Sequence, residues 1–241
     1  VGVPGIARWW SRRFRDLEAG CEEYDLVWMH QPLSLSPPDA SFWDKTLLTV
    51  HTTETAEYRL ARRGSYPRRR LPYLWVTTRL ERRFYRRLDT LDRPGPRYTV
   101  VAPHVREQLA ELGVSGASHV PNGRPTAPAS NTGSLRTQHD IPPDATVAFT
   151  VSSQTPQKRP VQCARALKEV CLADADVHAV IAGDGPLHGS VREQATSARL
   201  HVLGHVDERE KWQWLESADV FVSLSAYEGL PVAALEALAS Q

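Results

Sequence analysis

Short runs of apolar, β-branched residues alternate with longer stretches of helical periodicity along most of the chain. The predicted strands are residues 24–29, 45–50, 97–102, 118–122, 146–152, 177–183, 200–204 and 219–224. The predicted helices are residues 5–19, 72–90, 104–113, 160–173, 187–198, 208–217 and 232–240. Several strands are apolar throughout, as expected of strands that are covered on both faces of a parallel sheet. The alternation therefore predicts an α/β fold with doubly wound parallel sheets.

One segment interrupts this rhythm. Residues 122–144 are rich in Pro, Gly, Ser, Thr and Asn, a composition typical of linkers, and the strand–helix units restart after it. We therefore predict two Rossmann-like domains, residues 1–122 and 145–241, joined by a linker at residues 123–144. The chain lacks an initiator Met and stops within a predicted helix, so both domains are expected to be incomplete.

The bulk composition is that of a folded, water-soluble protein. Hydrophobic residues make up 41% and charged residues 24% of the 241 residues, which argues against disorder. Three cysteines indicate a reducing compartment without a disulfide framework. The chain has no apolar run of about 18 residues and opens with no signal peptide, so we expect neither a membrane span nor secretion. The expected location is the cytoplasm.

The formal net charge of +1 hides a strongly basic segment. Between Arg59 and Arg87 there are eleven arginines and one acidic residue, Glu81, which gives this segment +10 and leaves −9 for the rest. The apolar residues at near-helical spacing in its second half are Tyr73, Val76, Leu80, Phe84, Leu88 and Leu91. A solvated helical face is one interpretation; nucleic-acid binding is not expected, because no recognised module is present. We favour peripheral contact with the inner face of an anionic membrane.

The last predicted strand–helix junction carries two glutamates, Glu228 and Glu236. Glu228 precedes Gly229, Leu230 and Pro231, and proline suits the first position of a helix. Ligands of parallel α/β sheets bind at the carboxyl ends of strands, where the next helix presents free N–H groups. An ionised carboxylate on the surface of that helix can accept two hydrogen bonds from a cis-diol such as ribose. An ordinary helix start followed by a solvated glutamate explains the spacing equally well.

This junction resembles the signature of the GT-B retaining glycosyltransferases of family 4, the glycosyl transferases group 1. The matching residues are Ser225, Glu228, Gly229, Pro231, Glu236, Ala237 and Ala239. The resemblance implies that Glu228 lies against the donor sugar, that the backbone of 229–231 meets sugar and phosphate, and that Glu236 holds the ribose. It also implies an enzyme that moves a sugar from a nucleoside-diphosphate sugar to a glycan or lipid-linked acceptor.

Further stretches match in family order. The turn at residues 183–186 resembles the family's Gly-Asp-Gly-Pro turn, and we assign it no chemistry. The resemblance implies that the backbone of His205 and Val206 lies beside the nucleotide base. His51 follows the predicted strand 45–50 and precedes a Thr-rich turn; a structural histidine is the alternative there. The resemblance implies that His51 faces the donor sugar across the cleft.

Residues 151–160 match the family pattern in part. The family turn reads Gly-Arg-Leu and then Lys, and the resemblance implies that the Arg and Lys clamp the donor diphosphate. Lys158 fits the lysine, but Ser153 stands where the arginine is expected. Losing a donor of this kind costs about 2.7–4 kcal/mol in related sites. Either Arg159 or Arg124 substitutes, or the protein is slow, or it is an inactive module that binds a nucleotide sugar or a membrane surface.

We expect no metal and no other cofactor. The nine histidines are scattered and no Cys-x-x-Cys pair occurs. In place of a metal ion, Lys158 and a helix N-terminus would neutralise the leaving diphosphate. The nucleotide sugar then enters as a co-substrate.

Overall fold

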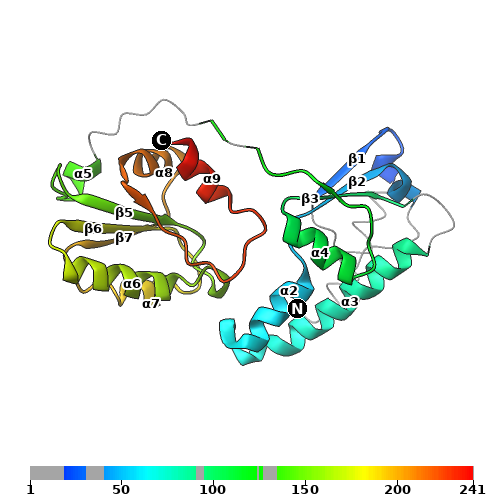
Figure 1. Cartoon of the computed structure of the whole chain (residues 1–241), viewed down its shortest axis with the longest axis horizontal. Helices are drawn as coiled ribbons and strands as arrows, with labels where there is room; N and C mark the ends of the chain where they lie inside the picture. Colours follow the sequence, from blue (N-terminus) through cyan, green and yellow to red (C-terminus); the bar gives the residue numbers. More distant parts are fainter. Residues whose placement is uncertain (1–18, 31–40, 91–94, 124, 127–134, 241) are drawn as a thin grey trace. The chain divides into compact units, whose positions relative to one another are not determined.

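The computed structural model describes residues 19–30, 41–90, 95–123, 125–126 and 135–240, drawn in colour in Figure 1. The chain divides into two compact units, residues 1–122 and 123–241. Each unit contains its own four-stranded parallel sheet, which confirms the predicted α/β class. Arg124 and most of the helix predicted at residues 5–19 lie outside the described residues.

The first unit has its strands in sequential order, β1-β2-β3-β4. They are β1 Val27–His30, β2 Thr46–Val50, β3 Arg97–Val100 and β4 Ser118–His119, each within a residue or a few of its predicted bounds. The helices are α2 Glu54–Leu60, α3 Leu71–Asp89 and α4 Pro103–Glu111, with short helices η1 Ser41–Lys45, η2 Ala61–Ser65 and η3 Arg68–Arg70.

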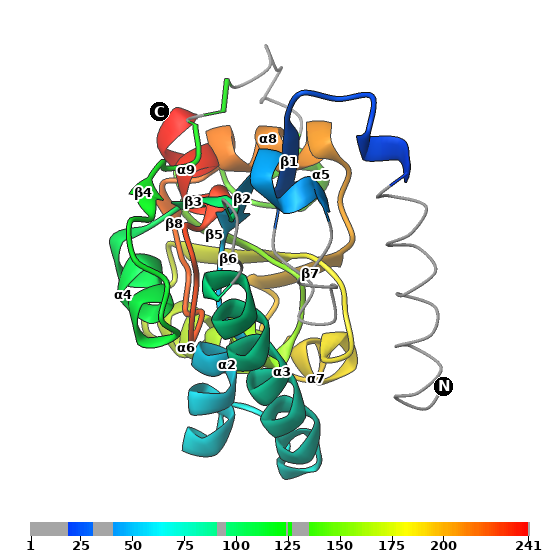
Figure 2. The same ribbon diagram turned by 90° about the vertical axis from the view of Figure 1, so that its right-hand side faces the viewer.

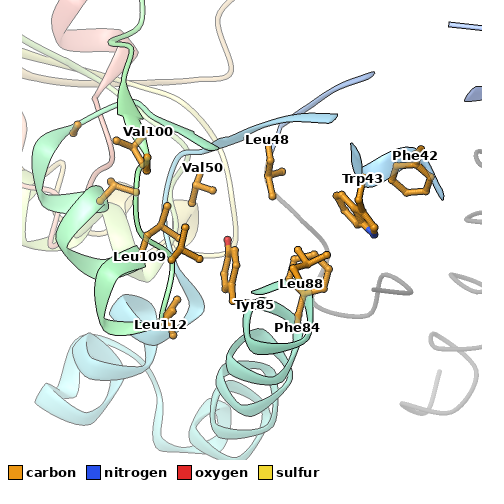
Figure 3. Close-up of a cluster of buried hydrophobic side chains, with 14 of the residues drawn as sticks. Phe42, Trp43, Leu48, Val50, Phe84, Tyr85, Leu88, Val100, Leu109 and Leu112 are labelled. Carbon is orange, nitrogen blue, oxygen red and sulfur yellow. The ribbon is translucent and has the colours of Figure 1, made fainter. Parts of the chain in front are cut away.

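The core of the first unit forms where α3 and α4 pack on one face of this sheet. Figure 3 shows the side chains of Phe84 and Tyr85 from α3 directed toward the strands, where Leu48 and Val100 are fully buried. The apolar stripe of α3 is divided between core and surface: Phe84 and Leu88 are buried, whereas Tyr73 and Val76 are exposed. In the first half of α3 the buried face runs through Leu74 and Thr78, which lie one or two residues on from the stripe.

Helix α2 was missed by the sequence analysis, which placed a Thr-rich turn there. Its N-cap Thr53 accepts a hydrogen bond from the backbone N–H of Ala56. Glu81 of α3, which lies beside α2 in Figures 1 and 2, accepts hydrogen bonds from the N–H groups of Glu54 and Thr55. Burial raises the pKa of Glu81 to about 7. A side chain of the same unit thus already occupies the N-terminus of α2.

The second unit has the strand order β7-β6-β5-β8. The strands are β5 Thr146–Val151, β6 Val177–Ala182, β7 Leu200–Gly204 and β8 Val220–Phe221. The chain winds outward from β5 to β7 and then returns to the other side of β5 with β8. This reversal is the mark of a doubly wound sheet, and it places a topological switch point between β5 and β8.

Helices cover both faces of this second sheet, as Figure 1 shows. They are η5 Pro156–Lys158, α6 Pro160–Ala173, α7 His188–Arg192, α8 Glu208–Ser217 and α9 Val232–Ala239, preceded by the short α5 Leu135–Gln138. Helices α6 and α8 have their predicted bounds, and α7 ends earlier than predicted.

Part of the segment predicted as a linker packs into the core of the second unit. Leu135 and Ile141 are buried in one cluster with Trp212 and Trp214 of α8. These two apolar residues are isolated in a polar sequence, so composition alone hides their contacts. Residues 127–134 of the same segment are outside the described part of the chain.

Candidate functional site

A cavity of about 320 Å³ opens in the second unit at the carboxyl ends of β5 and β8. Val151 and Ser152 line it from the end of β5, and Ser223 and Ser225 line it from the segment after β8. Open α/β sheets bind their ligands at such a switch point, because the loops that follow the two strands diverge there. The cavity therefore lies where the fold itself predicts a ligand.

Two of the predicted catalytic residues meet in this cavity. The Nζ atom of Lys158 donates a hydrogen bond to Oε1 of Glu228 over 2.6 Å, and both side chains are about a quarter exposed, at 24% and 23%. Lys158 ends the short helix η5, and Glu228 lies in the connection between β8 and α9. They are the charged side chains among the described residues that line the cavity. Paired, they leave it with no net charge.

The loop that carries Lys158 is held on one side by the β8–α9 connection. Gln157 donates from its side-chain Nε2 to the carbonyl of Tyr227 over 3.0 Å. The backbone N–H of Ala226 donates in turn to the carbonyl of Gln157 over 2.8 Å. These two bonds fix the backbones that carry Lys158 and Glu228, so the ion pair is positioned by both loops.

On its other side the same loop rests on the turn after β6. Gln154 is fully buried. Its backbone N–H donates to the backbone carbonyl of Asp184, and its side-chain Nε2 donates to the carbonyl of Gly183, each over 2.8 Å. Gly183 has φ +116°, and a Cβ atom there would lie 1.9 Å from the carbonyl oxygen of Ser152. The Gly-Asp-Gly-Pro turn therefore supports the loop of Ser152 and Gln154, and only glycine fits at 183.

Three more predicted residues lie at the cavity. Ser153, Leu230 and Pro231 line it, and Ser153 is exposed. Gly229 directly precedes Leu230. Pro231 is the N-cap of α9 with φ −70°, and the first helical residue is Val232. The helix thus begins at residue 232, as predicted, and Pro231 lies one position before its first helical residue.

Arg159, His205 and Val206 are not among the described residues that line the cavity. Arg159 is exposed and forms the N-cap of α6 with a left-handed φ of 50°. His205 is exposed and Val206 is half-buried; they follow β7, which β6 separates from β5. The structure therefore brings Ser153 to the cavity but gives Arg159 no place in its wall.

Glu236 differs from its prediction, because it is buried and does not lie on the open surface of its helix. Its Oε1 accepts a hydrogen bond over 2.7 Å from Nζ of Lys211 in α8, which also donates to Glu208 over 2.6 Å. Helix α9 packs on α8 through small side chains, and this packing turns position 236 toward α8. Lys211 was missed, since no motif links two residues that lie 25 positions apart.

His51 lies in the first unit, directly after β2. Its Nε2 is 3.0 Å from Nδ1 of His30, which ends the neighbouring strand β1. Burial, and secondarily the charge of His30, lower the pKa of His51 and so favour its neutral form. His30 was missed, although it follows a predicted strand just as His51 does. The carboxyl ends of adjacent parallel strands meet at one edge, and that rule could have paired them.

In the described part of the chain, no group of three or more His, Cys, Asp or Glu side chains is arranged to hold a metal ion. The three cysteines are buried, and none of them forms a disulfide bond.

Comparison with known proteins bears on the unit that contains the cavity. Residues 131–241 match the family model described as Glycosyl transferases group 1. The match lies within the second unit and covers less than half of the chain. The matched residues include Lys158, Glu228 and the whole lining of the cavity.

Other known proteins resemble this chain beyond the residues that the family model matches. A GDP-mannose-dependent α-(1-6)-phosphatidylinositol dimannoside mannosyltransferase of Mycobacterium tuberculosis is 29% identical over 138 residues, which is 56% of this chain and 36% of that protein. The crystal structure of Anabaena HepE in complex with UDP-glucose aligns with 94% of this chain and 60% of that chain, at 16% identity and a TM-score of 0.67. Sucrose-phosphate synthase of Thermosynechococcus elongatus aligns with 100% and 60%, at 16% identity and a TM-score of 0.67.

The two structural neighbours establish the fold, which is that of GT-B glycosyltransferases. The chain spans less than two thirds of the length of each of these relatives.

Proposed function

We propose that the protein transfers a sugar, with retention of configuration, from a nucleoside-diphosphate sugar to a glycan or lipid-linked acceptor, as a family 4 enzyme. The observation that carries this proposal is the Lys158–Glu228 pair in the cavity at the switch point of the second unit, within the residues that match the glycosyl transferases group 1 model. Lys158 offers a cation for a leaving diphosphate, and Glu228 offers a carboxylate for sugar hydroxyls. The relatives named for GDP-mannose and UDP-glucose support this donor class.

In the proposed reaction the bond between the anomeric carbon and the diphosphate breaks through an oxocarbenium-like transition state. Lys158 and the N–H groups at the start of α9 stabilise the charge that develops on the diphosphate, so the scheme needs no metal ion. Glu228 orients the sugar. The acceptor hydroxyl attacks the face that the diphosphate leaves, steered by the leaving phosphate, and its proton passes to an oxygen of that phosphate.

The remaining predicted residues have binding roles in the proposal. The hydroxyl of Ser153, which lines the cavity, donates to a phosphate in place of the arginine found in the family. The backbone of His205 and Val206 lies beside the base. Glu236 accepts from the ribose hydroxyls while Lys211 holds its carboxylate in place.

A binding screen tests the donor class. We expect one of UDP, GDP and ADP, or its sugar conjugate, to bind the chain and raise its melting temperature, with GDP-mannose and UDP-glucose tested first. At a ligand concentration 100 times Kd the stabilisation is about 2.7 kcal/mol. Glu169→Gln, an exposed change on α6 away from the cavity, should bind the same ligand equally well. If every nucleotide fails to bind in calorimetry, the proposal is wrong.

We also propose that α3 contacts an anionic membrane on the inner, cytoplasmic face. Arg79, Arg82, Arg83, Arg86 and Arg87 line one shallow hollow on its exposed side, together with Thr90. Upstream, Tyr73, Trp75 and Val76 expose 57%, 44% and 37% of their surface. Arginines beside exposed aromatic and aliphatic side chains are typical of surfaces that bind lipid headgroups. Among the described helices, none is long and apolar enough to cross a membrane.

Vesicle co-sedimentation tests this contact. The triple change Arg83→Gln, Arg86→Gln and Arg87→Gln is expected to weaken binding to phosphatidylserine vesicles by roughly 100-fold, at about 1 kcal/mol for each charge. The matched control changes three exposed arginines of the second unit, Arg165, Arg192 and Arg209, to Gln. Equal binding to neutral phosphatidylcholine vesicles, or equal losses in both triple variants, would argue against a membrane surface on α3.

A further inference from the structure

We infer that Glu228 competes with the phosphates of the ligand for Lys158, so that a diphosphate enters the cavity only by displacing this carboxylate. The inference rests on the proposed function and deepens it: it gives Glu228 a role in admitting the ligand as well as in contacting the sugar. It also specifies which ligands gain from the exchange and which do not.

The charges around the cavity support this competition. Lys158 Nζ and Glu228 Oε1 are 2.6 Å apart, and within the described lining they are the two charged side chains. The polar side chains that remain in the lining are neutral: Thr150, Ser152, Ser153, Gln154, Ser223 and Ser225. An incoming diphosphate therefore meets a wall whose cation already has an anionic partner. Its strongest contact requires that partner to leave.

The geometry allows the exchange without a change of fold. The backbones on both sides of the pair are held by the bonds of Gln157 to Tyr227 and of Ala226 to Gln157. The two charged side chains are each about a quarter exposed, so water reaches the pair and its net stabilisation is small. Rotation of the Glu228 side chain is then enough to release Lys158.

The exchange has opposite consequences for donor and product. A nucleoside-diphosphate sugar offers phosphates to Lys158 and sugar hydroxyls to Glu228, so both groups regain partners when their pair opens. A nucleoside diphosphate offers phosphates alone, so Glu228 gains no sugar hydroxyl when Lys158 turns to the phosphates. The carboxylate therefore lowers the affinity for the free nucleoside diphosphate but not the affinity for the nucleoside-diphosphate sugar.

The test is a double-mutant cycle on nucleotide affinity, measured by calorimetry with UDP, GDP and their sugars. Glu228→Gln is expected to bind the nucleoside diphosphate about three- to fivefold tighter than the unmodified protein, since removal of a partly exposed partner yields a gain of this size. The same variant should bind the donor sugar no tighter. Lys158→Met should lower the affinity for both ligands. Adding Glu228→Gln to this variant should not change either affinity further.

The controls separate a specific competitor from a general charge effect. Glu169→Gln removes a negative charge from exposed α6 and should leave both affinities unchanged. If Glu228→Gln tightens nucleoside-diphosphate binding by the same factor in the Lys158→Met variant, the inference is overturned. The gain would then come from the overall charge of the domain and not from release of Lys158. If Glu228→Gln leaves the affinity for the nucleoside diphosphate unchanged or lowers it, the inference is overturned, while the proposed function still stands. If neither the unmodified protein nor any variant binds a nucleotide, the proposed function fails with it.

Discussion

Replacing Lys158 by methionine is expected to lower the turnover of sugar transfer by about 100- to 1,000-fold, the usual effect of losing one donor to a developing oxyanion. Lys158 is the cation within the described cavity lining, and it already lies 2.6 Å from Glu228. Methionine keeps most of the length and apolar stem of the side chain but removes the ammonium group. The loss should therefore fall on kcat, because the missing contact strengthens as the diphosphate leaves.

Steady-state kinetics with the donor identified by the binding screen measure this loss. Lys168→Met makes the same change on α6, away from the cavity, and should retain full turnover. A loss of less than tenfold for Lys158→Met would contradict the assigned role and move the diphosphate clamp to another cation, with Arg159 the first to test. Nucleotide binding without any turnover in the unmodified protein would instead favour the inactive module that Ser153 suggests.

The architecture of the second unit was predictable because its strands and long helices each have a clear pattern of apolar residues in the local sequence. The apolar runs at 146–152, 177–183 and 200–204 each contain a strand, and α6 has its predicted bounds, with Pro160 as its first residue. Lys158 and Glu228 were each assigned to the donor site through the family resemblance, and their ion pair was not predicted. Their positions are 70 residues apart, and no spacing rule connects them.

What escaped prediction depends on contacts between distant segments. Gln154 and Gln157 act on backbone carbonyls of other loops, so their partners leave no pattern of side chains in the sequence. Glu236 faces Lys211 because of how α9 packs on α8, which a helical wheel of α9 alone cannot give. Helix α2 is seven residues long and is fixed by Glu81 from α3, so it lacks the apolar periodicity that reveals longer helices.

The largest effect on stability is expected from Gly183→Ala. The new methyl group would lie 1.9 Å from the carbonyl oxygen and 2.9 Å from the carbonyl carbon of Ser152, and both are backbone atoms that cannot rotate away. At φ +116° the alanine backbone is strained as well. Overpacking and strain together should lower the free energy of unfolding of the second unit by roughly 3 kcal/mol or more.

Gly204→Ala is the matched control, because Gly204 belongs to the same unit and also has a left-handed φ, +79°. Its added methyl group would meet a His188 ring atom at 3.6 Å, an ordinary contact, so it should cost only about 1 kcal/mol of backbone strain. Urea unfolding, monitored by amide hydrogen exchange of β5 and β6, measures the free energy of unfolding of both variants. The clash also pushes on the loop of Ser152 and Gln154, which leads to Lys158, so Gly183→Ala should weaken nucleotide binding where Gly204→Ala does not. If the two variants are equally stable and bind equally well, the turn after β6 does not support the cavity.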